Sequence, residues 1–342
     1  MRVLVLLVAL VPVLHGQSDP FAAAQRLFDR QQWADAAQAF QQIETARPQE
    51  TPALLFVAKS RVHLNQFSEA GAALDAYLQA HPENAEALYL LAYVRFRENR
   101  PEESLQISTR AARISTPQSD DLKIVALDYV LLKDRLSAIR YLRMAVVMQP
   151  SNVEALYALG RVLYEENQFD AAIEAFGAVL RRDPQNVKAQ DNLGLCYEGK
   201  NEMERALPAY RKAIELDDRA ARHSAQPYLN LGILLTRTDK AAEAVPFLQR
   251  AVELDPDSPK THMELGRTYS LLNRFAEAAA ELEKSVQLKS DDGGTHYLLG
   301  RVYVRLGKGE LGKKEFAITD KLMQSKRTSA MPRVTAPQRP ME

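Results

Sequence analysis

The chain has 342 residues and a formal net charge of zero, with 44 lysines and arginines against 44 aspartates and glutamates. This balance provides no general electrostatic attraction to nucleic acid or to an anionic membrane surface. The single cysteine, Cys196, excludes an intramolecular disulfide framework, whereas 46% hydrophobic residues are sufficient for a continuous core.

Residues 1–16 combine Arg2 with an apolar run over 3–14 and the small residue Gly16. This pattern is typical of a secretory signal peptide, and the run is shorter than the roughly 20 residues of a membrane-spanning helix. We expect cleavage after Gly16 and a periplasmic or secreted protein that does not insert into the membrane. The alternative is an N-terminal anchor that is not cleaved.

Two small residues recur along 17–326, mostly at intervals of 34 residues. The first series is Ala24, Ala58, Ala92, Ala126, Gly160, Gly194, Gly232, Gly266 and Gly300. The second series is Ala36, Ala70, Ser104, Ala138, Ala172, Ala206, Ala244, Ala278 and Gly312. A fixed period of this length indicates a stack of repeated units rather than a single globule. We predict nine units, which start at residues 17, 51, 85, 119, 153, 187, 225, 259 and 293.

Each unit is predicted to be a helical hairpin. In 153–186, apolar residues follow the helical spacing in both halves, on either side of a polar turn. Asparagine, which tolerates the left-handed backbone conformation that ends a helix, recurs in this turn as Asn65, Asn99, Asn167, Asn201 and Asn273. Proline recurs where the second helix should stop, as Pro48, Pro82, Pro150, Pro184 and Pro256.

Two stretches depart from the pattern. The unit at 85–118 has Pro101, Ser104 and Ser108 where an aromatic residue, an alanine and a large apolar residue are expected, so we predict looser packing there. Gly194 and Gly232 are 38 residues apart, and we expect the four inserted residues, near 219–224, to lengthen the preceding helix by about one turn. At the end of the chain, 327–342 contains three prolines without apolar periodicity and is expected to be disordered.

The register of 153–186 resembles the tetratricopeptide repeat, on the residues Leu156, Leu159, Gly160, Leu163, Ala172, Phe176 and Pro184. The resemblance covers about 17–326. It implies an all-α solenoid, a right-handed superhelix of nine hairpins whose first helices line a concave, ligand-binding surface. It implies no catalytic activity.

The residues of this surface are predicted from the stripe that each first helix leaves outside its core. Earlier units place aromatic residues there, with Phe21 and Phe28 followed by the candidate partner-binding residues Tyr89, Tyr93, Phe96, Tyr157, Arg161 and Tyr164. Such aromatics favour packing against a peptide, and the alternative is that they pack only on neighbouring hairpins.

Later units place cations on the same stripe, including Arg267 and Arg301. Arginine forks onto carboxylates, which favours an acidic peptide or a C-terminal carboxylate, and the alternative is ordinary solvated charge. Asn192 and Asn230 occupy equivalent places and are expected to hydrogen-bond an extended peptide backbone.

Two further features carry no predicted chemistry. His262 and His296 are equivalent positions in adjacent units, but two ligands are few for a metal site, so a structural role is favoured. Cys196 is interpreted as a small buried hydrophobic residue. The sequence contains no phosphate-binding loop and no metalloprotease or hydrolase motif, so we predict no catalytic residues, no metal and no cofactor.

These observations favour a non-catalytic scaffold or adaptor that binds an extended peptide or a partner protein in its concave groove, in the assembly of a cell-envelope complex. The alternative is a structural subunit of an envelope or secretion assembly that uses its convex face or its ends and binds no peptide. Binding of RNA is a third hypothesis, which the export signal and the neutral charge disfavour.

Overall fold

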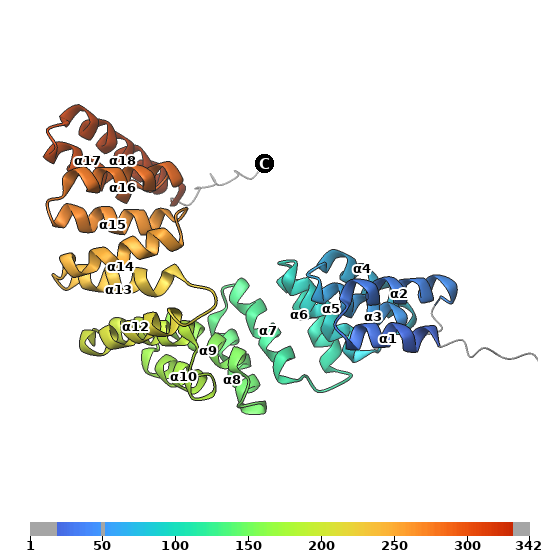
Figure 1. The fold of residues 1–342 in the computed structure, drawn as a ribbon. Helices are drawn as coiled ribbons and strands as arrows, with labels where there is room; N and C mark the ends of the chain where they lie inside the picture. Colours follow the sequence, from blue (N-terminus) through green and yellow to red (C-terminus); the bar gives the residue numbers. More distant parts are fainter. Residues whose placement is uncertain (1–18, 49–51, 331–342) are drawn as a thin grey trace, which may run out of the picture. The chain divides into compact units, whose positions relative to one another are not determined.

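The structure is a computed structural model that describes residues 19–48 and 52–330. Within these ranges it contains helices and no strands. The first helices of the hairpins are α1 (Pro20–Asp29), α3 (Ala53–His63), α5 (Ala85–Arg97), α7 (Ser119–Leu131), α9 (Val153–Glu165), α11 (Val187–Gly199), α13 (Ala225–Arg237), α15 (Pro259–Leu271) and α17 (Gly293–Arg305). The second helices are α2 (Trp33–Ala46), α4 (Phe67–Ala80), α6 (Pro101–Ala112), α8 (Arg135–Met148), α10 (Phe169–Arg182), α12 (Met203–Asp217), α14 (Ala241–Leu254), α16 (Phe275–Leu288) and α18 (Gly309–Ala330). The predicted all-α class, with helices for nine hairpins, is confirmed (Figure 1).

The first helices α5, α7, α9, α11, α13, α15 and α17 begin at the residues where the repeat period starts a unit. The predicted signal segment 1–16 lies outside the described residues, as does 331–342. Helix α18 continues to Ala330, past residue 326, where the disordered tail was expected to start. The segment 324–330 contains neither glycine nor proline, so its backbone offers no local reason for the helix to stop.

The turns between paired helices use the left-handed conformation. Asn65, Asn99, Asn167, Asn201 and Asn273 have φ angles of 58°, 60°, 57°, 62° and 59°, which confirms the prediction from the recurring asparagine. This conformation suits asparagine better than most residues because its short polar side chain stabilises the backbone locally. Each such turn reverses the chain and lets the second helix pack back on the first.

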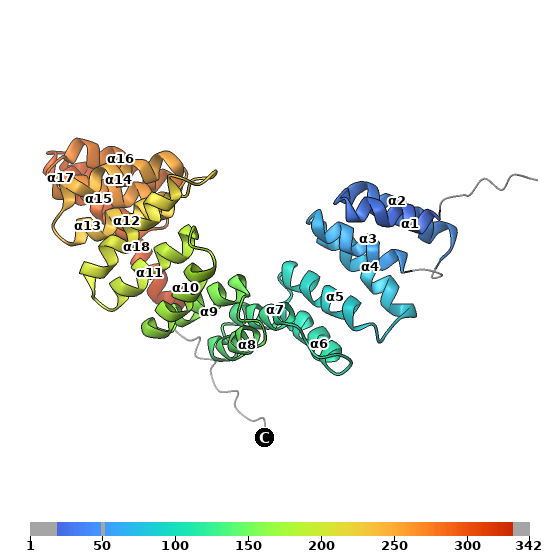
Figure 2. The ribbon, with the colours of Figure 1, turned by 60° about the horizontal axis from the view of Figure 1, so that its bottom comes forward.

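The chain divides into two compact units, Met1–Val162 and Leu163–Glu342. In the first unit each helix from α1 to α8 packs on the next, and the first helix α5 also touches the first helices α3 and α7. Figure 2 shows the pairs α1–α2 and α3–α4 of this unit. In the second unit the same holds from α10 to α18, and α11, α13, α15 and α17 form a continuous row of first helices.

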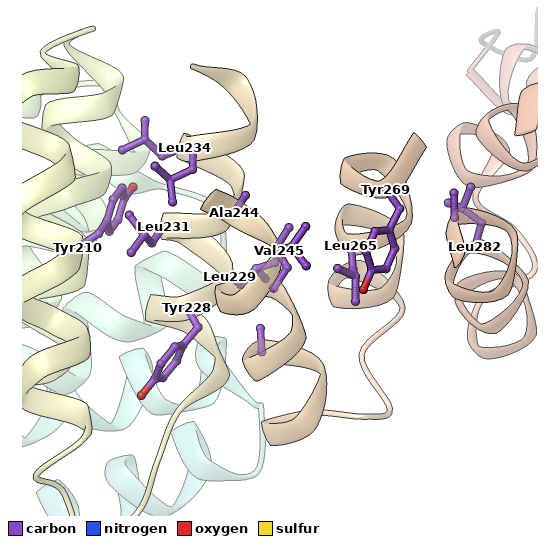
Figure 3. Close-up of a cluster of buried hydrophobic side chains, with 14 of the residues drawn as sticks. Tyr210, Tyr228, Leu229, Leu231, Leu234, Ala244, Val245, Leu265, Tyr269 and Leu282 are labelled. Atoms are coloured by element: carbon purple, nitrogen blue, oxygen red, sulfur yellow. The ribbon is translucent and has the colours of Figure 1, made fainter. Parts of the chain in front are cut away.

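The core of the second unit depends on glycines in its first helices. A Cβ atom added to Gly194 would lie 2.4 Å from the ring of Tyr210, and one added to Gly300 would lie 2.7 Å from the ring of Phe316. Tyr210 is fully buried and points toward Leu231 and Leu234 of the next hairpin (Figure 3). The glycines therefore leave room for large side chains that fill the space within and between hairpins.

The third and fourth hairpins meet through a polar contact. Ser104 Oγ of α6 donates a hydrogen bond of 2.6 Å to Asp128 Oδ2 of α7, and both residues are buried. Burial raises the pKa of Asp128 to about 7. Hydrophobic clusters lie on both sides of this contact, one ending with Ala111 and the other starting with Leu122. The serine that departs from the repeat pattern thus places a buried hydrogen bond to a carboxyl group between α6 and α7.

The prediction that the four-residue insertion lengthens a helix is wrong. Helix α12 has 15 residues against 14 in α10, and residues 218–224 form a loop. The buried carboxylate of Asp217 accepts a 2.9 Å hydrogen bond from the Ser224 backbone N–H, and the Ser224 side chain caps α13. These capping interactions stabilise the loop in place of another helical turn.

Candidate functional site

The first helices of the first unit line a cavity of about 630 Å³. Helix α5 forms its floor with Tyr89 and Tyr93, while α3 and α7 contribute Lys59 and Lys123. The remaining lining residues are Ala85, Glu86, Leu90, Ala92, Ser108, Ser115, Thr116, Gln118, Asp120, Asp121, Ile124 and Glu154. We call this the tyrosine cavity. Helix α8, the second helix packed on α7, contributes no residue to it.

Tyr89 and Tyr93 are held at the tyrosine cavity by hydrogen bonds of their hydroxyl groups. Tyr89 donates to the Ser115 carbonyl at 2.9 Å, and Arg97 Nη1 donates to the Tyr93 hydroxyl at 2.6 Å. Burial, followed by the nearby Asp121 carboxylate, raises the pKa of Tyr89. Phe96, predicted from the same stripe, is half-buried on α5 but does not line the cavity. The rings therefore present fixed, partly apolar surfaces to the cavity.

Charged groups around the tyrosine cavity are mostly carboxylates. Lys59 pairs with Glu86 at 2.6 Å, and Lys123 bridges Asp120, at 2.9 Å, and Glu154. Asp121 adds a fourth carboxyl group, which accepts a 2.7 Å hydrogen bond from the Gln118 N–H. Both lysines are thus paired with carboxylates that line the cavity.

Sequence reasoning missed Asp120 and Lys123, although a signal was available. They lie 34 residues before Glu154 and Tyr157, so the stripe that predicted Tyr157 also selects them in the preceding unit.

The three candidates on α9 do not join the tyrosine cavity. Tyr157 is half-buried and Arg161 is exposed, and neither lines it. Tyr164 is half-buried, with its ring centroid 5.7 Å from that of Phe169. Phe21 and Phe28 pack on aromatic residues of the first and second hairpins, since Phe21 lies 5.2 Å from Phe40 and Phe28 lies 5.3 Å from Phe56. Phe21 and Phe28 therefore pack on neighbouring aromatic residues, which was the alternative to peptide binding for these positions.

The second unit has a cavity of about 550 Å³ with arginines at its rim. The predicted residues Arg267 and Arg301 meet here, together with Arg305. Its other lining residues are Ser270, Leu271, Phe275, Leu298, Val304 and Phe316, and no carboxylate is among them. We call this the arginine cavity.

The arginines of this cavity have limited pairing. Arg305 lies over the Phe275 ring at 4.7 Å from its centroid, and Arg301 lies 6.0 Å from the centroid of Tyr297. Arg267 Nη1 is 3.8 Å from a carboxylate oxygen of Glu264, a separation at the outer limit of an ion pair. Three guanidinium groups over an apolar floor can receive an anionic group attached to an apolar one.

Asn192 and Asn230 are placed differently from the expectation. Both are buried, and Asn192 Nδ2 donates to the Lys188 carbonyl at 2.7 Å. Asn230 Nδ2 lies 2.9 and 3.1 Å from the two carboxylate oxygens of Asp191, whose pKa is raised to about 6 by burial. The Asn230 amide joins α11 to α13 instead of facing a ligand, because hairpin stacking brings Asp191 beneath it.

His262 and His296 make the same contacts in successive hairpins. His262 Nδ1 lies 2.7 Å from Glu281 Oε2, and its Nε2 donates to the Pro256 carbonyl at 3.0 Å. His296 repeats this arrangement with Glu315 and the Ser290 carbonyl. Both nitrogens of each ring are therefore used within the fold. Among the described residues no group of three or more His, Cys, Asp or Glu side chains is placed to hold a metal ion.

Cys196 is buried on α11. Burial raises the pKa of its thiol to about 12, so the reactive thiolate is suppressed.

The row of hairpins and the cavities between their first helices define a helical-repeat protein. Sequence models of the tetratricopeptide repeat match residues 58–120, 126–176, 157–221 and 235–293. The chain therefore belongs to the tetratricopeptide repeat family, as the resemblance of 153–186 predicted. Proteins of this fold are typically non-catalytic scaffolds that bind proteins or peptides.

Two curated proteins and one solved structure show the range of relatives. BBSome complex member BBS4 of Bos taurus is 23% identical over 205 residues, which is 60% of this chain and 38% of that protein. The peroxisomal targeting signal receptor of Saccharomyces cerevisiae is 24% identical over 211 residues, 58% of this chain and 34% of the receptor. The chain thus spans less than half the length of these relatives.

The solved structure of a tetratricopeptide repeat protein from Parabacteroides merdae has a TM-score of 0.58 and 17% identity, and the match covers 73% of this chain and 97% of that one. This likeness supports the fold alone. Across 19–48 and 52–330, no helix combines the length and the apolar character needed to cross a bilayer.

Proposed function

We propose that this protein is a non-catalytic scaffold that binds an extended segment of a partner protein on its first helices. The observation that carries the proposal is the tyrosine cavity, where Tyr89 and Tyr93 lie beside polar backbone groups of the loop before α7. Rigid aromatic rings supply contact area at little entropic cost, and nearby polar groups supply orientation.

The arginine cavity supplies a second element of recognition. Arg267, Arg301 and Arg305 favour an acidic side chain or a terminal carboxylate, and the apolar floor favours a hydrophobic neighbour of that group. The tyrosine cavity, with its excess of carboxylates, favours a neutral or basic segment. A partner that carries both kinds of segment matches both cavities.

The proposal includes a role in assembling a complex of the bacterial cell envelope. The signal-like residues 1–16 support export to the periplasm or beyond. A relative named as a receptor for a targeting signal supports recognition of a short segment by this repeat type. A structural subunit that binds no peptide is the competing function.

The test is capture of a partner from a native envelope extract by the exported chain, followed by identification of the bound protein. Tyr93→Ala combined with Arg301→Gln removes one anchor from each cavity, and we expect capture to fall at least about tenfold. Gln79→Ala on the exposed face of α4 is the matched control and should leave capture unchanged. Circular dichroism should show equal helical content in all variants.

Undiminished capture by the double variant contradicts the proposal. Crosslinks from the captured protein that map to second helices instead of α5, α15 and α17 favour the structural subunit.

A further inference from the structure

Helix α8 exposes large apolar side chains, which the other second helices of the described chain, except the terminal α18, do not. Leu136 and Val147 are 73% and 81% exposed, and Met144 and Met148 are also exposed. Of the second helices in the described ranges, only α8 and the terminal α18 carry exposed large apolar residues. Four exposed large apolar side chains on one helix form a candidate interaction surface.

The repeat itself shows that this stripe is not required by the fold. The equivalents of Val147 in the other units are all polar, namely Thr45, Gln79, Arg113, Arg181, Glu215, Glu253, Gln287 and Lys321. The equivalents of Leu136 are all small or charged, namely Ala34, Ser68, Glu102, Asp170, Glu204, Ala242, Ala276 and Glu310. The buried face of α8, with Ala138, Ile139, Leu142 and Ala145, follows the common pattern. The difference is therefore confined to the face turned to solvent.

The same face is basic. Arg140 and Arg143 are exposed on it, and the sequence of α8 contains no acidic residue. Asp134, just before the helix, uses its carboxylate to accept a 3.0 Å hydrogen bond from the Ser137 N–H. Leu136, Arg140, Arg143 and Val147 follow at steps of three or four residues, which places them on one stripe of the helix.

We infer that α8 docks an amphipathic helix of a partner protein whose apolar residues are interspersed with carboxylates. The 14 residues of α8 span about 21 Å, which is the length of roughly four turns of a partner helix. The apolar ends of the stripe bury hydrophobic side chains, and Arg140 and Arg143 at its centre select acidic ones.

The charge of the stripe argues against a second copy of this chain as the occupant. A symmetric pairing of α8 with itself would bring Arg140 and Arg143 against like charges. A lipid surface fits less well because one helix width is available and the tyrosine nearest to the stripe, Tyr141, stacks on Tyr129 and lies under Arg140. The surface is separate from both cavities, so it goes beyond the proposed scaffold function.

The test measures binding of the full chain to a fluorescent helical peptide of about 18 residues, with leucines on one face and glutamates between and beside them. Leu136→Ser with Val147→Gln installs the residues of the second hairpin, Ser68 and Gln79, and should weaken binding at least about tenfold. Arg140→Gln with Arg143→Gln installs the residues of the first hairpin, Gln38 and Gln41, and should weaken binding and reduce its salt dependence. Because these residues occur at the same positions of intact hairpins, the variants should keep their helical content.

Two matched controls locate the binding. A peptide with lysine in place of every glutamate should bind at least about tenfold more weakly. Gln79→Ala and Lys240→Gln, at exposed positions outside α8 and outside both cavities, should leave binding of the acidic peptide unchanged.

Four results would overturn the inference. The first is no binding of the acidic peptide, and the second is binding that the cavity variants Tyr93→Ala and Arg301→Gln abolish but the α8 variants do not. The third is self-association of the chain that Leu136→Ser/Val147→Gln abolishes, and the fourth is binding to phosphatidylglycerol vesicles instead of the peptide, abolished by the same variant. Failure of partner capture by the cavities would leave this result unaffected, because the two assays use different surfaces.

Discussion

The two units of this protein are built on one repeat and differ in what that repeat leaves free. In the first unit the first helices form a cavity with two tyrosines and a rim rich in carboxylates. In the second unit they form a cavity with three arginines and no carboxylate. The repeat constrains only the residues that pack between helices. The exposed residues of the first helices can therefore carry negative charge in one unit and positive charge in the other.

The units also differ in how closely paired helices approach. The first four hairpins have Ala24, Ala58, Ala92 and Ala126 at the close contact, whereas the last four have Gly194, Gly232, Gly266 and Gly300. The glycines admit large side chains directly against the backbone, and the hydrophobic core of the second unit continues from Ala206 to Tyr303. The hydrophobic core of the first unit is interrupted by the buried, hydrogen-bonded pair of Ser104 and Asp128. The second unit is therefore expected to be more sensitive to side-chain volume, while the buried carboxyl groups Asp128 and Asp191 make the stability of both units depend on pH.

The largest expected effect tests the sensitivity to volume. Gly194→Leu places a side chain where even a Cβ atom would lie 2.4 Å from the Tyr210 ring, and we expect a loss of about 3 kcal/mol in the free energy of unfolding. Thermal unfolding followed by circular dichroism measures the change. Gly177→Ala is the control, because its added Cβ meets only Arg181 at 3.6 Å and a gain of up to about 1 kcal/mol is expected from helix propensity. Equal stability of Gly194→Leu and the unmodified chain would refute the close approach.

A smaller effect is expected when the charge of the arginine cavity is changed. Arg301→Gln with Arg305→Gln should weaken binding of a short acidic peptide with an apolar residue beside its carboxylate by about tenfold, or roughly 1.4 kcal/mol. Fluorescence polarisation at two salt concentrations measures the loss. Lys240→Gln, an exposed cation outside the cavity, controls for net charge. An equal loss of acidic-peptide binding in Lys59→Gln, at the tyrosine cavity, would show that the two cavities do not differ in their preference for acidic peptides.

The last expected effect concerns pH and the buried Asp128. Its carboxyl group titrates near pH 7 in the folded chain, against about 3.9 when unfolded, so between these values the folded state holds the extra proton. The free energy of unfolding should therefore fall as the pH rises from about 4 to about 7. Asp128→Asn should remove most of this fall, so the first unit of the variant should be more stable than that of the unmodified chain at pH 8.

Urea unfolding at pH 5 and pH 8 checks this prediction. Trp33, the only tryptophan of the chain, lies in the first unit and reports on it by fluorescence. Asp257→Asn, in an exposed turn of the second unit, is the control. An Asp128→Asn chain that keeps the full pH dependence would assign that dependence to other groups.

The candidate site was predictable in part. The stripe rule found Tyr89, Tyr93, Arg267 and Arg301 because the direction of a side chain on a helix follows from its number in the repeat. The stripe rule failed for Asn230, whose amide is buried and hydrogen-bonded to Asp191 of the preceding hairpin. A polar residue on a stripe can be a ligand group or a buried bridge, and only the neighbouring hairpin decides between them.

The sequence by itself determined the helical hairpins, the starts of the first helices from α5 onward and the turns, because these depend on local periodicity and on backbone preferences such as that of Asn65. It determined the family for the same reason, since the small residues repeat at a constant interval. Only the tertiary structure decided which exposed side chains gather in the two cavities and which carboxylates become buried. Those outcomes depend on groups tens of residues apart, such as Ser104 with Asp128, that meet only when the hairpins stack.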